Sequence, residues 1–147
     1  MAKAAFIGLG VMGYPMAGHL QKNGHDVTVF NRTSAKAKKW AKEYGGKSAA
    51  TPAKAAEGAD FVFSCVGNDD DLRSVVYGDK GILAGMKKGA IYCDHTTASA
   101  IVAREIDKEC KKLGIEFLDG PVSGGQAGAE NGKLTIMVGG KKKAYNT

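Results

Sequence analysis

The chain has 147 residues, of which 44% are hydrophobic and 24% charged, a composition typical of globular rather than disordered proteins. This length favours one domain with a substantial core. The net charge of +6 favours anionic partners, but the basic residues form no stripe interleaved with aromatic side chains, so we expect no nucleic-acid partner.

No apolar run approaches the roughly 18 residues of a membrane-spanning helix. With no separate signal segment at the amino terminus, we expect no membrane partner and a cytoplasmic location.

Apolar runs alternate with amphipathic runs along the whole chain. The sequence predicts strands at 4–8, 27–30, 47–49, 61–66, 90–93 and 116–118, and a further apolar run at 134–138 after the tight-turn signal Asn131-Gly132. Helices are predicted at 12–22, from 33 or 34 to 44, from 52 to Gly58, from 68 onward, and at 98–112. Continuously apolar strands are typical of parallel sheets covered on both faces. The alternation therefore predicts a single α/β domain over residues 1–147, a doubly wound, mostly parallel sheet of the Rossmann type.

Local signals predict the ends and faces of these helices. Thr33 or Ser34 can cap the second helix, which should end at Gly45-Gly46, and Thr51-Pro52 is a capping hydroxyl followed by proline. Apolar residues at helical spacing predict the core faces of the first and last helices: Met12, Met16 and Leu20, and Val102, Ile106, Cys110 and Leu113.

Three cysteines, Cys65, Cys93 and Cys110, stand far apart in the sequence. An odd number without a C-x-x-C pair indicates neither a disulfide framework nor a zinc site. We interpret all three as buried, unreactive thiols in a reducing compartment.

The first predicted strand runs into the block Gly8-Leu9-Gly10-Val11-Met12-Gly13, which matches G-x-G-x-x-G. The pattern alone is weak, but here it follows a strand and opens a helix in the first βαβ unit. Gly8 would permit the tight turn, Gly10 would let the backbone approach a pyrophosphate, and Gly13 would let the helix pack close to the strand. Backbone N–H groups at the helix start would face the anion. The block predicts a dinucleotide site.

The end of the second predicted strand reads Asn31-Arg32-Thr33. Enzymes selective for NAD usually place Asp or Glu at this point to bind the ribose. Asn31 would not repel a 2′-phosphate, and Arg32 can offer it a forked, charge-assisted contact. Asp26 precedes the strand and so lies at its wrong end. We therefore predict NADP rather than NAD as the cofactor.

Three consecutive carboxylates, Asp69 to Asp71, follow the fourth predicted strand. Carboxylates suit the positive end of a helix dipole. Adjacent helical residues point in different directions, so we favour a helix start over a metal site.

Longer blocks carry a more specific resemblance. The run from Gly8 to Gly13 continues Tyr14-Pro15-Met16-Ala17, a second block runs from Asp119-Gly120-Pro121-Val122-Ser123-Gly124-Gly125 to Leu134, and Asp94-His95-Thr96-Thr97 lies between them. In order and spacing these blocks resemble the β-hydroxyacid dehydrogenases, the family of 3-hydroxyisobutyrate dehydrogenase, tartronate semialdehyde reductase and glyoxylate/succinic semialdehyde reductase. The resemblance spans essentially the whole chain.

The resemblance implies a role for each matched position. The first block would hold the pyrophosphate, residues 31–33 the adenosine ribose, and Thr97 the ribose or nicotinamide. A small carboxylate substrate would bind at the second block. The implied sets are Gly8, Leu9, Gly10, Val11, Met12, Gly13, Asn31, Arg32, Thr33, Val66, Gly67, Asn68 and Thr97 for the cofactor, and Ser123, Gly124 and Gly125 for the substrate.

Two departures from the family pattern stand out. His95 occupies a position that is usually apolar in the family; we expect a hydrogen-bonded or solvent-facing side chain, with a proton donor as the alternative. Family members are about twice as long, and their catalytic lysine would lie beyond Thr147, so we expect no catalytic residue within this chain and no helical C-terminal domain.

The sequence thus predicts the NADP-binding domain of an oxidoreductase that transfers hydride between nicotinamide and a small β-hydroxyacid or semialdehyde. The resemblance also implies a homo-oligomer for the intact enzyme. The alternative is a stand-alone module that binds NADP(H) without chemistry.

Overall fold

The computed structural model describes residues 3–10, 13–96, 100–119, 122–123, 135–136 and 139–140. The strands are β1 (Lys3–Ile7), β2 (Asp26–Phe30), β3 (Lys47–Ser48), β4 (Phe61–Ser64), β5 (Ile91–Asp94), β6 (Glu116–Asp119), β7 (Val122–Ser123), β8 (Thr135–Ile136) and β9 (Gly139–Gly140). The helices are α1 (Gly13–Lys22), α2 (Ser34–Tyr44), α3 (Pro52–Ala56), α4 (Asp69–Val76), α5 (Ile82–Gly85) and α6 (Ala100–Lys112).

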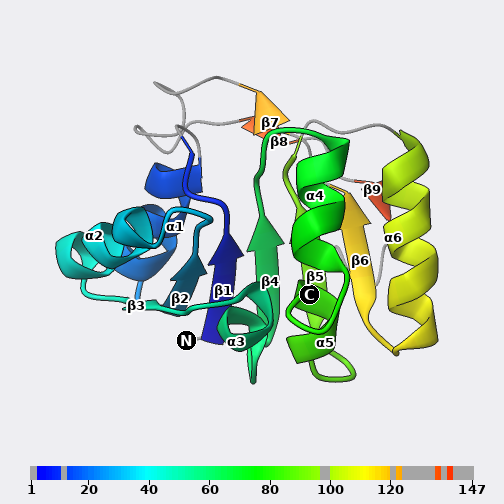
Figure 1. Cartoon of the computed structure of the whole chain (residues 1–147), viewed down its shortest axis with the longest axis horizontal. Coiled ribbons are helices and arrows are strands. Elements are labelled where there is room, and N and C mark those ends of the chain that lie inside the picture. The colour runs from blue at the N-terminus through cyan, green and yellow to red at the C-terminus, as the bar shows by residue number, and fades with distance from the viewer. Residues whose placement is uncertain are drawn as a thin grey trace.

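One seven-stranded sheet, in the order β3-β2-β1-β4-β5-β6-β9, forms the centre of the molecule (Figure 1). The first six strands of this order are mutually parallel, and β9 pairs antiparallel with β6. The order is that of the doubly wound dinucleotide-binding sheet, so the predicted fold class is confirmed. Strands β7 and β8 form a separate antiparallel pair, which Figure 1 shows beyond the carboxyl ends of the parallel strands.

Helices cover both faces of the sheet, and the central strand β1 shows how. Ala5 and Ile7 point to a core cluster shared with α3, α4, α5 and α6. Ala4 and Phe6 point to the opposite cluster, shared with α1 and α2. Because successive strand residues face opposite sides, a strand buried on both sides must be apolar throughout, which is the pattern that the sequence shows.

Capping signals explain one end of several helices. Thr51 Oγ1 accepts a hydrogen bond from Lys54 N at 3.1 Å, as predicted for α3. Gly45 ends α2 with a φ of 78°, in the left-handed region that favours glycine. Thr33 is the N-cap residue of α2, but its side chain makes no capping hydrogen bond. The predicted side-chain cap is therefore wrong at Thr33.

The predicted core face of α1 is confirmed for Met16 and Leu20, which pack against the core, whereas that of α6 needs one correction. The residues of α1 that are fully packed are Gly13, Ala17 and Gly18, whereas Met16 and Leu20 are only partly buried. Small residues let this helix approach the sheet closely, so the larger ones flank the contact instead of filling it. On α6, Val102, Ile106 and Cys110 are buried as predicted. Leu113 is 48% exposed, because α6 ends at Lys112 and the chain then turns.

Two element boundaries also differ from the prediction. Strand β4 ends at Ser64 instead of residue 66. Cys65 N still donates to Ile7 O of the neighbouring strand β1, but Val66 N leaves the strand ladder and donates to the Thr96 hydroxyl. Helix α5 was not predicted, because four residues are too few to show helical periodicity.

The three cysteines are buried thiols that form no disulfide, as predicted. Burial, and to a lesser extent the Asp94 carboxylate, raises the pKa of the Cys65 thiol to about 11. Burial likewise raises the pKa of Cys110 to about 12. Thiols of this kind carry little of the reactive thiolate at neutral pH. Among the helices that the structure describes, none combines the length and apolar character needed to cross a membrane.

Candidate functional site

A cavity of about 620 Å³ opens at the carboxyl ends of β1, β2 and β4. The connections leaving β1 and β4 run to opposite faces of the sheet, so this is the switch point at which open α/β sheets bind ligands. Its walls come from the β1–α1 turn, the end of β2, the β4–α4 turn and one side of α4. The lining residues are Ile7, Gly8, Leu9, Gly10, Gly13, Phe30, Asn31, Arg32, Thr33, Pro52, Cys65, Val66, Gly67, Asp71, Ser74, Val75, Tyr77 and Lys80.

The three glycines of the first turn serve different purposes. Gly8 has a φ of +99°, and a Cβ there would collide with the Cys65 carbonyl oxygen. A Cβ on Gly13 would collide with the Gly8 carbonyl oxygen. Both glycines are therefore required by the protein's own packing. Among the residues that the structure describes, a Cβ on Gly10 would meet no atom within 4 Å, so Gly10 faces open space at the cavity wall.

Hydrogen bonds fasten this turn to the end of β2. Gly8 N donates to Phe30 O at 2.9 Å, and Leu9 N donates to Asn31 Oδ1 at 3.0 Å. The Leu9 side chain is fully buried among core residues on the α1 and α2 side of the sheet. The N–H groups of Gly8 and Leu9 thus shape the turn by bonding to acceptors within the protein.

Asn31 has a structural role that its residue type did not reveal. Besides accepting from Leu9 N, its amide nitrogen donates to Thr33 O at 3.3 Å. Asn31 therefore holds the glycine-rich turn and the segment after β2 in one arrangement.

Arg32 extends from the same segment and is 77% exposed. Its Nη2 lies 2.8 Å from Asp71 Oδ1, in the first turn of α4. The sequence predicted Arg32 at this site but not its partner, because 39 positions separate the two residues.

The β4–α4 turn forms the facing wall. Val66 and Gly67 line the cavity. Asn68, placed beneath the cofactor by the resemblance, does not line it; its amide oxygen instead accepts from Asp71 N at 2.8 Å and caps α4. This helix start confirms the interpretation of the three aspartates, and in the described residues no group of His, Cys, Asp or Glu is arranged to hold a metal ion.

A buried polar network joins the carboxyl ends of β4 and β5. Asp94 Oδ1 accepts from Ser64 Oγ at 2.6 Å and from Thr96 N at 3.1 Å. The Ser64 hydroxyl also lies 2.7 Å from the Tyr92 hydroxyl, and burial is the main reason that the Tyr92 pKa is raised well above its ordinary value. Thr96 Oγ1 accepts from Val66 N at 3.0 Å. The network fixes the turns after both strands, and sequence reasoning did not identify Ser64 or Tyr92.

His95 is buried rather than solvent-facing, with 6% of its surface exposed. Its ring stacks on Phe63, with the ring centres 5.8 Å apart and the planes 10° apart.

Several predicted site residues lie outside the described part of the chain: Val11, Met12, Thr97, Gly124 and Gly125. Of Ser123 only the backbone is described, as part of β7 opposite Thr135 of β8. Conversely, Asp71, Ser74, Val75, Tyr77 and Lys80 line the cavity without having been assigned to it from the sequence. The sequence offered one signal for them: α4 follows β4, the strand beside the switch point, so the first turns of α4 should lie near the ligand site.

Comparison with known proteins gives a family for this fold and cavity. Residues 3–147 match the family model described as the NAD binding domain of 6-phosphogluconate dehydrogenase. The chain belongs to this family. It is 67% identical over 147 residues to an uncharacterized oxidoreductase of Shewanella frigidimarina, covering all of this chain and 50% of that protein. It is 41% identical over 140 residues to the mitochondrial 3-hydroxyisobutyrate dehydrogenase of Mus musculus, covering 95% of this chain and 42% of that protein.

A solved structure agrees. The Mycobacterium tuberculosis 3-hydroxyisobutyrate dehydrogenase with L-serine superposes with a TM-score of 0.91 at 32% identity, over 99% of this chain and 49% of that one. The chain spans about half the length of the curated relatives it matches. It is the NAD(P)-binding domain of the β-hydroxyacid dehydrogenase family, and the predicted resemblance is confirmed.

The Asn31 contacts predict a stability effect that is separate from ligand binding. Replacing Asn31 by Ala removes the acceptor of the partly buried Leu9 N–H, so we expect the free energy of unfolding to fall by about 1–2 kcal/mol. Urea denaturation measures the change. Asn31→Asp retains an acceptor oxygen and should lose less; equal losses in the two variants would contradict the role of the Leu9 contact.

Proposed function

We propose that the chain binds NADP(H) in the cavity at the carboxyl ends of β1, β2 and β4, as the cofactor domain of an oxidoreductase. The observation that carries the proposal is Gly10: in contrast to Gly8 and Gly13, nothing in the described protein requires a glycine there. A glycine that faces open space without a need of the fold is explained by close approach of a ligand to the backbone.

The residues around the cavity fit the two charged parts of NADP(H), the pyrophosphate and the 2′-phosphate on the adenosine ribose. The glycine-rich turn and the start of α1 suit the pyrophosphate, because N–H groups and the helix dipole favour an anion. The segment after β2 suits the adenosine ribose. No carboxylate extends from the end of β2, and Arg32 provides a guanidinium there. These features support a preference for NADP over NAD, as does the related solved structure of Psf3 in complex with NADP+, which superposes with a TM-score of 0.90 at 29% identity.

We further propose that the protein serves hydride transfer to or from a small carboxylate. When bound, the nicotinamide would supply or accept the hydride. By the resemblance, Ser123, Gly124 and Gly125 would hold the carboxylate, and Thr97 would contact the cofactor. The relatives named as 3-hydroxyisobutyrate dehydrogenases support this substrate class and favour an enzyme domain over the stand-alone binding module. We also propose that the intact enzyme is a cytoplasmic homo-oligomer; buried thiols that form no disulfide suit a reducing compartment.

Two glycine variants separate ligand binding from folding. Gly10→Ala places a methyl group in open space, so its free energy of unfolding should change by less than about 0.5 kcal/mol. Its affinity for NADPH should fall about tenfold or more, which corresponds to about 1.4 kcal/mol. Gly13→Ala should instead lower stability by about 2 kcal/mol or more, since overpacking strains the turn. Calorimetric titration and urea denaturation give the two quantities. A Gly10→Ala protein that binds NADPH normally would contradict the proposed site.

Arg32 should account for the preference between cofactors. Wild-type protein should bind NADPH more tightly than NADH. Arg32→Ala should cost about 1.5–3 kcal/mol of NADPH binding, the scale of a charge-assisted hydrogen bond, with little effect on NADH. Lys39→Ala, which removes an equal charge from the exposed side of α2, is the matched control. Equal wild-type affinities for the two cofactors would rule out the NADP preference.

The purified 147-residue chain should bind NADPH without oxidising it. The resemblance places the catalytic lysine beyond Thr147, and a positioned acid or base contributes about 10²–10⁴-fold to a rate. Absorbance of NADPH in the presence of glyoxylate, succinic semialdehyde or tartronate semialdehyde measures turnover. A rate above about 1 s⁻¹, ordinary for an enzyme, would show that residues within the chain suffice. Loss of that rate in His95→Ala would then identify His95 as the proton donor.

A further inference from the structure

The guanidinium that the proposed cofactor would use already has an anionic partner. Arg32 follows β2 and Asp71 belongs to the first turn of α4, yet their side chains meet at 2.8 Å. Both residues line the same cavity. The contact therefore joins two walls of the cavity at the place where the sequence predicts the adenosine ribose.

We propose that Asp71 is a specificity-determining residue that limits the preference for NADP by competing with the 2′-phosphate for Arg32. This inference rests on the proposed NADP(H) site. A carboxylate and a phosphate are both matched by the forked guanidinium, and two anions held by one guanidinium repel each other. An unphosphorylated ribose carries a 2′-hydroxyl instead, which can donate a hydrogen bond to a carboxylate. Asp71 thus disfavours the phosphorylated ribose selectively.

The size of the effect follows from the exposure of the pair. The Arg32 side chain is 77% exposed and that of Asp71 is 32% exposed. Exposed ion pairs are weak because water screens them. Releasing Arg32 from Asp71 should therefore strengthen binding of a 2′-phosphorylated ribose by about two- to fivefold, a change that calorimetry resolves.

The fold does not depend on the Asp71 carboxylate. The Asp71 backbone N–H is satisfied by Asn68 Oδ1, and its carbonyl oxygen accepts from Ser74 Oγ at 2.6 Å. Both contacts persist in Asp71→Asn. The carboxylate also reaches over the β4–α4 turn: a Cβ on Gly67 would lie 2.6 Å from Asp71 Oδ2. The absence of a side chain at Gly67 leaves the room in which the Asp71 carboxylate lies.

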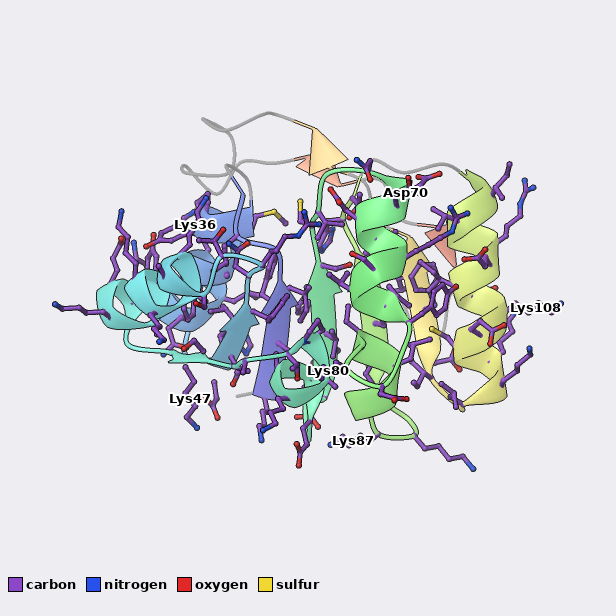
Figure 2. All side chains as sticks on the ribbon, viewed as in Figure 1. Lys36, Lys47, Asp70, Lys80, Lys87 and Lys108 are labelled. Atoms are coloured by element: carbon purple, nitrogen blue, oxygen red, sulfur yellow. The ribbon has the colours of Figure 1, made fainter. Side chains whose placement is uncertain are left out.

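The neighbouring Asp70 offers a matched control. It lies in the same helical turn, and its side chain is 96% exposed, 3.7 Å from Arg73; Figure 2 shows it at the end of α4 nearest the carboxyl edge of the sheet. Asp70→Asn removes the same charge from the same helix start without touching Arg32. It therefore reports any general effect of net charge or of the helix dipole.

The experiment titrates two adenosine fragments, 2′,5′-ADP and 5′-AMP, into the wild-type chain, Asp71→Asn, Asp70→Asn, Arg32→Ala and the double variant Arg32→Ala/Asp71→Asn. We expect Asp71→Asn to bind 2′,5′-ADP about two- to fivefold more tightly and 5′-AMP no more tightly than wild type. Asp70→Asn should bind both fragments as wild type does. In the Arg32→Ala background the gain should disappear, because the competition requires the guanidinium. The same comparison with whole cofactors should show tighter NADPH binding by Asp71→Asn and no gain for NADH. Urea denaturation checks that each variant is folded.

The outcomes separate this role from the proposed function. Weaker binding of 2′,5′-ADP to Asp71→Asn would show that the carboxylate orients Arg32 for the phosphate, which overturns the competition. An equal gain in Asp70→Asn, or a gain that survives in the Arg32→Ala background, would overturn it as well. If wild type binds NADPH but Asp71→Asn behaves identically, only the role of Asp71 fails. If wild type binds no dinucleotide or fragment, the proposed function fails, and this proposal with it.

Discussion

The close approach of Gly13 to the Gly8 carbonyl is the constraint on which the cavity depends. It brings the first turn of α1 against the end of β1, at a separation that leaves no room for a Cβ at Gly13. Helix α1 packs onward through Ala17, which joins the core cluster on this face, and through Gly18, which lies against the Tyr44 ring of α2. Leu9 packs into the core beneath the turn. The bond from Leu9 N to Asn31 then ties this unit to β2. The shape of the turn is therefore set by packing and hydrogen bonding within the protein.

The opposite side of the cavity depends on a buried carboxylate. Taking Asp94 out of water is costly, and the hydroxyl of Ser64 and the N–H of Thr96 offset that cost by donating to it. Because Thr96 in turn accepts from Val66 N, the carboxylate holds the turn after β5 against the turn after β4. Buried hydrogen bonds thus hold the β4 side of the cavity in place. Close backbone contact holds the β1–α1 turn in place on the other side.

The fold could be predicted because its signals are local and agree with one another. Apolar strands, the caps at Thr51 and Asn68, and the glycine after α2 each reflect an interaction within a few residues. The exposure of Leu113 could not be predicted in the same way, since it depends on where α6 ends relative to the sheet.

The candidate site was predictable in its residue types more than in its contacts. Gly10 and Arg32 follow from what an anion requires, and both line the cavity. The side-chain partners of Asn31 and Arg32 are 22 and 39 positions away, and only the folded sheet brings them together. The same holds for the network around Asp94, whose partner Ser64 is 30 positions away. Residue type indicated what each group can bind but not which neighbour it meets.

The short strands at the two ends of the sheet have a consequence for solubility. Strand β3 has two residues, both exposed, and its Lys47 pairs with Asp26 of β2 at 3.6 Å. At the other end β9 also has two residues, and both are glycine. A long, flat, apolar edge would offer a row of unpaired N–H and C=O groups on which a second chain could add a strand. Among the described strands, the longer apolar ones lie inside the sheet order, and β3 offers an edge of only two residues that carries charge. The β3 edge of this sheet is therefore poorly suited to recruiting strands from other molecules into aggregates.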